Sequence, residues 1–343
     1  TEAGNTFGGL VTVKAGQTDL RARDSLNVSL DQTGATTLTA GDMLTLGGTA
    51  ASLATDSAAL TFGTTQVTGG GSFTARGAVS QLAGQALQVG GATTFDAGSE
   101  ALSLTEAGNT FGGLVTVKAG QTALRARDSL NVSLDQTGAT TLTAGDALTL
   151  GGTAASLVTD SAALTFGATR VTGDGSFTVR GAVSQLTGKA LQIGGATTVD
   201  ATGQTVSLTE AGNKFDGLVT VKAGQTDLSA SDNLNVALDQ IGATTLTAGQ
   251  ALTLAGSAAS LVTDSAALTF GVTRVTGDGS FTARGAVSQL AGQALQVGGA
   301  TTFDAGSQTL TLTEASNTFG GLVTVKAGDT ALRSRDSLNV ALS

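Results

Sequence analysis

The stretch Asn109-Thr110-Phe111-Gly112-Gly113-Leu114-Val115-Thr116-Val117-Lys118-Ala119-Gly120 occurs, almost letter for letter, four times in this chain. The other copies begin at Asn5, Asn213 and Asn317, so corresponding residues lie 104 positions apart without insertion or deletion. Self-similarity at a fixed period is the signature of a repeat architecture. The sequence therefore predicts internal repeats at residues 1–104, 105–208 and 209–312, followed by a partial copy at 313–343.

The composition restricts both the fold and the chemistry. The 343 residues include 50 Gly but no Pro, Cys, His, Trp or Tyr. The absence of Pro suits a fold in which nearly every backbone N–H is needed in a hydrogen-bonded ladder. Without His and Cys, Ser-His and Cys-His nucleophilic sites and His-based metal sites are excluded. The net charge of −9 also argues against a nucleic-acid partner, which requires clustered Lys and Arg.

Short runs of alternating apolar and polar residues fill each copy, and Gly, Asp, Asn or Ser separates them. This period of two is typical of strands with one buried face, and no Gly-free helical stripe of useful length interrupts it. In residues 1–104 we expect strands at 10–13, 26–30, 37–40, 44–46, 52–55, 60–62, 66–68, 72–75, 80–82, 87–89, 94–96 and 102–104.

Two all-β architectures compete for such a pattern. A tandem array of immunoglobulin-like sandwiches would have about seven strands per copy, hairpin turns and a large buried aromatic residue. The many short runs and the absence of any linker favour a parallel β-solenoid instead, with one continuous core over residues 1–343. We expect about five coils of about 21 residues, each with three strands, per 104-residue copy. With strands about 4.8 Å apart, the chain would form a rod about 80 Å long.

The phenylalanines support an internal stack. All 12 lie in the four positions of the copy occupied by Phe7, Phe62, Phe73 and Phe95, and the one replacement, Val199, is also apolar. We expect these rings to stack on aliphatic neighbours inside the coils, with each buried ring contributing about 1.5–3 kcal/mol. An aromatic binding platform is the less favoured alternative.

The string Asn109-x-Phe111-Gly112-Gly113-x-Val115, followed by Gly-punctuated Leu-x-Leu runs, resembles the stalks of filamentous-haemagglutinin-type adhesins. These are large bacterial exoproteins exported by two-partner secretion, and autotransporter passengers share the style. The resemblance covers the whole chain in repeat style and composition. It implies a right-handed parallel β-helix on the cell surface that serves adhesion, aggregation or biofilm attachment. The secretion domain of that family is not visible in this sequence.

The charged residues of each copy form the first candidate site, because some β-helical enzymes cleave acidic polysaccharides with Lys, Arg and carboxylates. The candidates are Lys14, Arg21, Arg23 and Asp24, with Lys118, Arg125, Arg127 and Asp128 in the next copy. In the third copy Ser229 and Ser231 replace the arginines, while Asp232 persists. Since an enzyme needs one special site and these charges recur in every copy, we interpret them as a solvated face with local ion pairs.

Other polar motifs have structural explanations of the same kind. Gly173-Asp174-Gly175 and Thr159-Asp160-Ser161 offer oxygen ligands for calcium, but turn chemistry alone accounts for Asp at such places. Ice binding needs Thr-x-Thr on one face of every coil, whereas pairs such as Thr37/Thr39 and Thr311/Thr313 are scattered. We also interpret two asparagine sets as structural: Asn5, Asn109, Asn213 and Asn317 before the Phe-Gly element, and Asn27, Asn131, Asn235 and Asn339 between apolar residues.

The sequence thus predicts a non-catalytic protein without catalytic, cofactor or metal residues. We expect a rigid stalk of a secreted bacterial surface adhesin, located at the cell surface or in the extracellular matrix. Its partner would be a receptor or a matrix polysaccharide, bound through regions outside this stretch, with self-association end to end or side by side as an option. The alternatives are a self-assembling extracellular filament or matrix subunit, then a polysaccharide-acting β-helix enzyme or an ice-binding solenoid.

Overall fold

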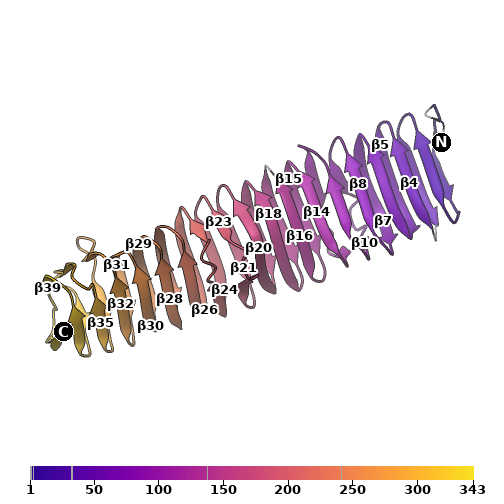
Figure 1. Ribbon diagram of the computed structural model, residues 1–343. Helices are drawn as coiled ribbons and strands as arrows, with labels where there is room; N and C mark the ends of the chain where they lie inside the picture. Colours follow the sequence, from indigo (N-terminus) through magenta and orange to yellow (C-terminus); the bar gives the residue numbers. More distant parts are fainter. Residues whose placement is uncertain (1, 3, 32–33, 137, 241) are drawn as a thin grey trace. The chain divides into compact units, whose positions relative to one another are not determined.

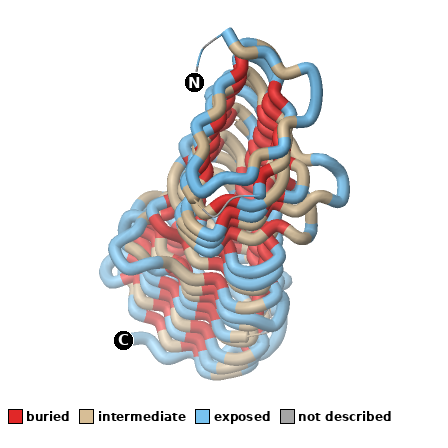
Figure 2. Tube along the Cα trace, turned by 90° about the vertical axis from the view of Figure 1, so that its right-hand side faces the viewer, coloured by how far each residue is buried: buried red, intermediate tan, exposed pale blue. Residues whose placement is uncertain are grey.

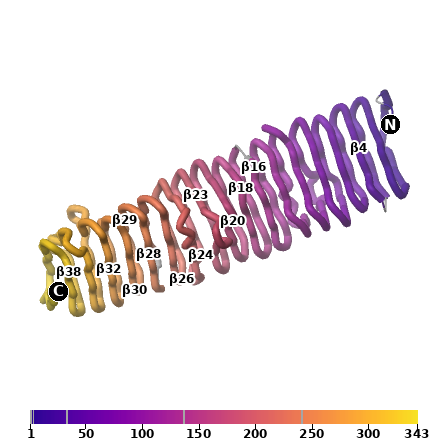
Figure 3. The backbone as a smooth tube through the Cα atoms, viewed as in Figure 1, coloured from indigo at the N-terminus to yellow at the C-terminus, as the bar shows by residue number. Residues whose placement is uncertain are grey.

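The computed structural model describes residues 2, 4–31, 34–136, 138–240 and 242–343, and it is all-β, with no helix among these residues. The chain divides into two compact units, residues 1–170 and 171–343. In each unit the chain winds in successive coils, and each coil pairs with the next through parallel strands (Figures 1 and 3). The coils of the two units together amount to about 18 turns.

The strands are short and follow one another closely. Those of the first unit are β1 (Leu10–Val13), β2 (Thr18–Ala22), β3 (Leu26–Asp31), β4 (Ala35–Ala40), β5 (Met43–Ala50), β6 (Ser52–Ser57), β7 (Ala59–Val67), β8 (Gly71–Ala75), β9 (Val79–Gln81), β10 (Leu87–Val89), β11 (Thr93–Asp96), β12 (Ala101–Leu104), β13 (Thr110–Phe111), β14 (Leu114–Ala119), β15 (Gln121–Ala126), β16 (Leu130–Gln136), β17 (Ala139–Ala144), β18 (Ala147–Ala154) and β19 (Ser156–Ser161), and β20 (Ala163–Val171) crosses the boundary between the units.

The second unit continues the same pattern of strands. Its strands are β21 (Gly175–Val179), β22 (Val183–Gln185), β23 (Leu191–Ile193), β24 (Thr197–Leu208), β25 (Lys214–Phe215), β26 (Leu218–Ala230), β27 (Leu234–Gln240), β28 (Ala243–Ala248), β29 (Ala251–Ala258), β30 (Ser260–Ser265), β31 (Ala267–Val275), β32 (Gly279–Ala283), β33 (Val287–Gln289), β34 (Leu295–Val297), β35 (Thr301–Asp304), β36 (Leu310–Leu312), β37 (Thr318–Phe319), β38 (Val323–Lys326), β39 (Thr330–Leu332) and β40 (Val340–Leu342).

Two long parallel ladders enclose the core of the first unit. The first ladder joins β1, β3, β5, β7, β9, β12, β15, β17 and β19. The second ladder joins β2, β4, β6, β8, β11, β14, β16 and β18. Each coil therefore contributes one strand to each ladder, and the buried residues of the two ladders line facing inner walls (Figure 2).

The sequence repeat and the coil repeat do not coincide. Strand β1 belongs to the first ladder, but its copy 104 residues later, β14, belongs to the second. Likewise β2 belongs to the second ladder and its copy β15 to the first. One copy therefore spans five coils and about half of another, so that equivalent residues of consecutive copies lie on opposite walls.

The second unit obeys the same rule. There the first half of β26 pairs with β24, with Val219 opposite Thr197. This ladder continues through β27 and β29. The equivalent strand of the following copy, β38, pairs Val323 with Thr301 of β35, in the ladder of β28, β30 and β32. The alternation of walls is thus a property of the repeat.

Each copy contains a run of narrow coils followed by wide ones. Register partners lie 17 or 18 residues apart in the narrow coils, as for Val11 and Val28, but 22 apart in the wide coils, as for Gln66 and Gln88. The additional residues of the wide coils form a third, short ladder of β7, β10 and β13 in the first unit, and of β31, β34 and β37 in the second.

The third side begins at a glycine corner. Strand β5 shifts register between Leu46 and Gly48, where one strand starts to serve two ladders. Gly48 has a φ of 100°, and a Cβ there would lie 2.0 Å from the carbonyl oxygen of Leu30. Only glycine fits both the left-handed backbone and this close approach. Gly152 and Gly256 repeat the feature, with φ of 98° and 104°.

The wide coils hold the aromatic core. Phe62, Phe73 and Phe95 are fully buried, with ring centroids 4.9 Å apart for Phe62 and Phe73 and 5.2 Å for Phe73 and Phe95. Phe270, Phe281 and Phe303 repeat this stack in the second unit. Narrow coils are filled by Leu, Val, Ala and Thr, because a protein interior is close-packed and a larger cross-section needs larger side chains.

The predicted fold class is confirmed: the protein is an all-β, parallel β-solenoid with about five coils per copy. The phenylalanines are internal as predicted, except for Phe7, which is half-buried, and the rings of Phe62, Phe73 and Phe95 contact one another. The prediction of three strands in every coil is wrong, because only the wide coils have three. Strand β2 was not expected, since its charged residues Asp19 and Arg21 hide the alternation of its buried positions.

Candidate functional site

An open hollow lies where a wide coil is followed by narrow ones. Strand β13 ends the short ladder of the first unit, and the next two coils pass without a third side, so that the surface steps inward. The resulting hollow has a volume of about 580 Å³ and includes Phe111 and Gly112 of the wide coil and Asp128, Ser129 and Asp146 of the narrow coils. The change in coil size is therefore the cause of the hollow.

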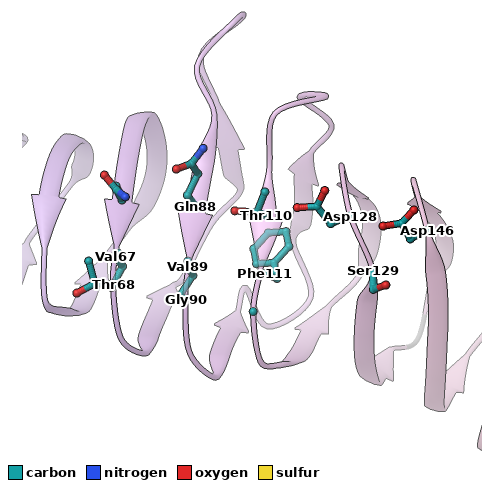
Figure 4. A pocket seen from close by; sticks show the side chains of 12 residues that line it. Val67, Thr68, Gln88, Val89, Gly90, Thr110, Phe111, Asp128, Ser129 and Asp146 are labelled. Carbon is teal, nitrogen blue, oxygen red and sulfur yellow. The ribbon is translucent and has the colours of Figure 1, made fainter.

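A row of polar side chains runs along this hollow, one from each coil (Figure 4). Gln66 pairs in register with Gln88, and Gln88 with Thr110. The backbone N–H of Asp146 lies 3.5 Å from the carbonyl oxygen of Asp128, so these two coils continue the row. Since neighbouring strands lie about 4.8 Å apart, the row presents amide, hydroxyl and carboxylate groups at that interval.

The second unit contains two hollows at equivalent positions. One, of about 410 Å³, includes Arg274, Gln296, Thr318 and Asp336, where Arg274 pairs with Gln296 and Gln296 with Thr318. The other, of about 280 Å³, includes Lys214, Asp216, Asp232 and Gln250. The first unit also has a smaller hollow of about 240 Å³. It is lined by Phe7, Gly8 and Ser25, which are the equivalents of Phe111, Gly112 and Ser129.

Several of the predicted charged residues form ion pairs. Lys14 pairs with Asp31 and Lys118 with Asp96, while Asp128 lines the hollow of about 580 Å³. Arg127 donates to both carboxylate oxygens of Asp128, at 3.1 and 3.0 Å, and these hydrogen bonds lower the pKa of the Asp128 carboxyl. Arg23 with Asp24 and Arg335 with Asp336 repeat the pair. The interpretation as local ion pairs is confirmed for these residues. Such exposed pairs contribute at most about 1 kcal/mol each.

The third copy replaces the arginine by a lysine from a different position. Ser231 stands where Arg127 stands, and Lys214, in the position of Thr110, lies 3.4 Å from Asp232 and 3.6 Å from Asp216. The hydrogen bond to Asp232 and the two negative charges raise the pKa of Lys214. The sequence did not indicate a role for Lys214, because this lysine stands at the position of Thr110 and not at one of the charged positions that recur between copies.

A buried amide pair closes the loops beside the hollow. Asn109 has no exposed surface, and its Oδ1 accepts hydrogen bonds from the Leu87 N–H at 2.8 Å and from Gln81 Nε2 at 2.6 Å. Its Nδ2 lies 3.2 Å from the carbonyl oxygen of Leu104, and the Oε1 of Gln81 lies 3.3 Å from the Glu106 N–H. Asn213 with Gln185 and Asn317 with Gln289 repeat this arrangement, so the structural interpretation of these asparagines is confirmed.

The other candidate residues do not converge on a site. Asp174 accepts a hydrogen bond from the Ala196 N–H at 2.8 Å, which is turn chemistry between adjacent coils. Asn27 and Asn131 are exposed in β3 and β16. Thr37 and Thr39 lie in β4, whereas Thr311 lies in β36 and Thr313 beyond it. Among the residues that the structure describes, no three His, Cys, Asp or Glu side chains are grouped as a metal site would require.

In the described ranges, no helix has the length and hydropathy to span a membrane. Searches among curated proteins and among solved structures found no significant match to the chain. A family model described as repeats of unknown function (DUF5649) matches residues 47–118, 153–222 and 256–326. Each match begins within one residue of a glycine corner, at Gly48, Gly152 or Gly256. It then extends through the wide coils to the strand that follows the Phe-Gly element. Because these matches together cover more than half of its residues, the chain belongs to this family of repeats, DUF5649.

Proposed function

We propose that this chain is a section of the rigid, non-catalytic stalk of a secreted bacterial surface adhesin, which holds a binding element away from the cell. The main support is that four structural features recur at 104-residue steps: the glycine corner, the wide coils, the buried amide pair and the hollow. A scaffold that sets distance gains from such repetition, because stacked coils contribute almost additively to stability and the number of copies sets the reach.

The chemistry of the surface also favours a scaffold over an enzyme. Groups that an enzyme would concentrate in one place are distributed over the copies, and the arginines and aspartates at the hollows neutralise each other in pairs. A self-assembling filament is the second candidate. It is favoured by leucines that are exposed in successive copies, at 47%, 45% and 49% for Leu82, Leu186 and Leu290.

The stalk proposal is tested on the full-length gene product in the cells that make it. An epitope inserted after Gly84, in a loop at which a side chain would meet no neighbour within 4 Å, should be labelled by antibody on intact cells. Brief external protease treatment should abolish the labelling. Removal of residues 105–208 should bring the distal end of the protein about 26 Å closer to the cell, from five and a half coils at the spacing of parallel strands.

Labelling that appears only after the cells are permeabilised would refute a surface stalk. The filament alternative is separated by sedimentation velocity of the purified chain. A stalk section should keep the same sedimentation coefficient over a hundredfold range of concentration, whereas a filament subunit should form larger species as the concentration rises.

A further inference from the structure

We infer that the hollows are binding sites for a neutral, linear polysaccharide, so that the solenoid itself, and not only a distal element, contacts an extended glycan. This inference goes beyond the stalk proposal and does not depend on it. It starts from the shape of the site: an open trough of about 580 Å³ that crosses several coils, without the walls that would enclose a small molecule. An extended polymer can lie in such a trough and continue beyond it at both ends.

The polar row provides the hydrogen-bonding groups that sugar hydroxyls need. Gln88 and Thr110 in the first unit, and Gln296 and Thr318 in the second, lie outward and half-buried at the same positions of the short ladder. An amide both donates and accepts, and a carboxylate such as Asp146 accepts through two oxygens, which matches vicinal diols. The interval of about 4.8 Å between coils is close to the length of one sugar residue in an extended chain.

The charges select a neutral polymer. Arg127 compensates Asp128 and Arg335 compensates Asp336, while Lys214 stands between Asp216 and Asp232. The hollow of about 410 Å³ holds one further cation, Arg274, which is a single charge and not a run of them, and the net charge of −9 repels an acidic polysaccharide. Phe111, only 6% exposed, contributes a small apolar edge at the base of the trough.

The half-turn between copies adds a second consequence. The Phe-Gly element leads into the first ladder at β1 and into the second ladder at β14, so consecutive hollows of the first unit open on opposite edges of the coils. A polymer bound at one hollow cannot continue into the next. The chain would therefore engage separate polysaccharide strands and link them, with weak sites strengthened by multivalency.

The experiment measures binding of the whole 343-residue chain to three probes by isothermal titration calorimetry. The probes are a neutral linear β-1,4-glucan hexasaccharide, an acidic galacturonate hexasaccharide and the branched neutral polymer dextran. We expect binding of the neutral linear probe alone, with a dissociation constant of about 1 mM per hollow, which corresponds to a few net hydrogen bonds.

The variant Gln88→Leu/Gln192→Leu/Gln296→Leu removes the outward amide of the short ladder in each copy. It should weaken binding of the neutral probe at least fivefold. The control Gln17→Leu/Gln121→Leu/Gln225→Leu changes exposed glutamines of the same three copies outside the hollows and should leave binding unchanged. Absence of binding by the unaltered chain, preference for the acidic probe, or equal binding by both variants would each overturn the inference. None of these results bears on whether the chain is a surface stalk.

Discussion

A buried asparagine, Asn109, Asn213 or Asn317, holds two loops and two coils together at each of three places in the chain. The amide group of Asn109 satisfies backbone groups at Leu87 and Leu104 that are otherwise enclosed, and Gln81 extends the same network to Glu106. A buried N–H or carbonyl without a partner costs more than a hydrogen bond contributes, which makes this amide difficult to replace. Asparagine and glutamine occur at many positions in the sequence, so residue type alone does not identify this network. What distinguishes Asn109 from the exposed Asn131 is its burial.

The change Asn213→Ala tests this role in the third copy. It leaves the N–H of Leu191 and the carbonyl of Leu208 without their side-chain partner, and it should lower local stability by about 1–3 kcal/mol. Hydrogen exchange measured by mass spectrometry should show faster exchange in peptides from residues 185–215. The equivalent peptides around Asn109 and Asn317 provide an internal reference, because Ile193 and Val199 give the peptides from residues 185–215 distinct masses.

The matched control is Asn235→Ala, which removes an exposed asparagine from β27 of the same copy. It should leave the exchange of residues 185–215 unaltered. Equal effects of the two substitutions, or no effect of Asn213→Ala, would show that the buried amide is not a stabilising link.

At the scale of elements, the glycine corner of β5 decides where a narrow coil becomes a wide one. The strand bends after Leu46, and its second half starts the short ladder that carries Gln66, Gln88 and Thr110. Thr65 supports the corner, since its hydroxyl lies 3.0 Å from the carbonyl oxygen of Gly63. The hollow exists because this third side begins and, two coils later, ends.

The change Gly48→Ala should therefore be severe. Its methyl group would lie 2.0 Å from the Leu30 carbonyl oxygen in a left-handed backbone, and we expect a loss of about 3 kcal/mol or more from the two effects together. Gly84→Ala is the comparison: its φ is 72°, but no atom lies within 4 Å of the added methyl group, so the expected loss is about 1–2 kcal/mol. Urea unfolding followed by circular dichroism measures both, and equal losses would contradict a steric role for the corner.

For the whole molecule, the relation between the two periods matters most. A copy of 104 residues spans five coils and about half of another, so within each unit equivalent strands of consecutive copies lie in opposite ladders. Residues that are identical in sequence in consecutive copies thus lie on opposite walls of the coils within a unit.

Removal of residues 105–208 should still give a folded protein. The new junction joins Leu104 to Thr209, and the residue that normally follows Leu104 is also a threonine, so local contacts are restored. Because repeat stability is nearly a sum over neighbours, the urea m-value should fall in proportion to length while the per-residue circular dichroism stays the same. A shortened chain that is unfolded at 25 °C would mean that the copies are not interchangeable.

The sequence alone determined the repeat, the all-β class and the parallel coiling, because the 104-residue identity and the period-2 alternation are local and can be counted. It also indicated that the phenylalanines are internal and that Arg127 and Asp128 belong to an ion-paired face. The tertiary structure alone decided the sizes of the coils, the half-turn between copies and the hollow with Gln88, Thr110 and Asp146. Those features depend on which residues become hydrogen-bonded neighbours in adjacent coils. That register is set by packing around the aromatic core and by corners such as Gly48, and no single run of sequence contains it.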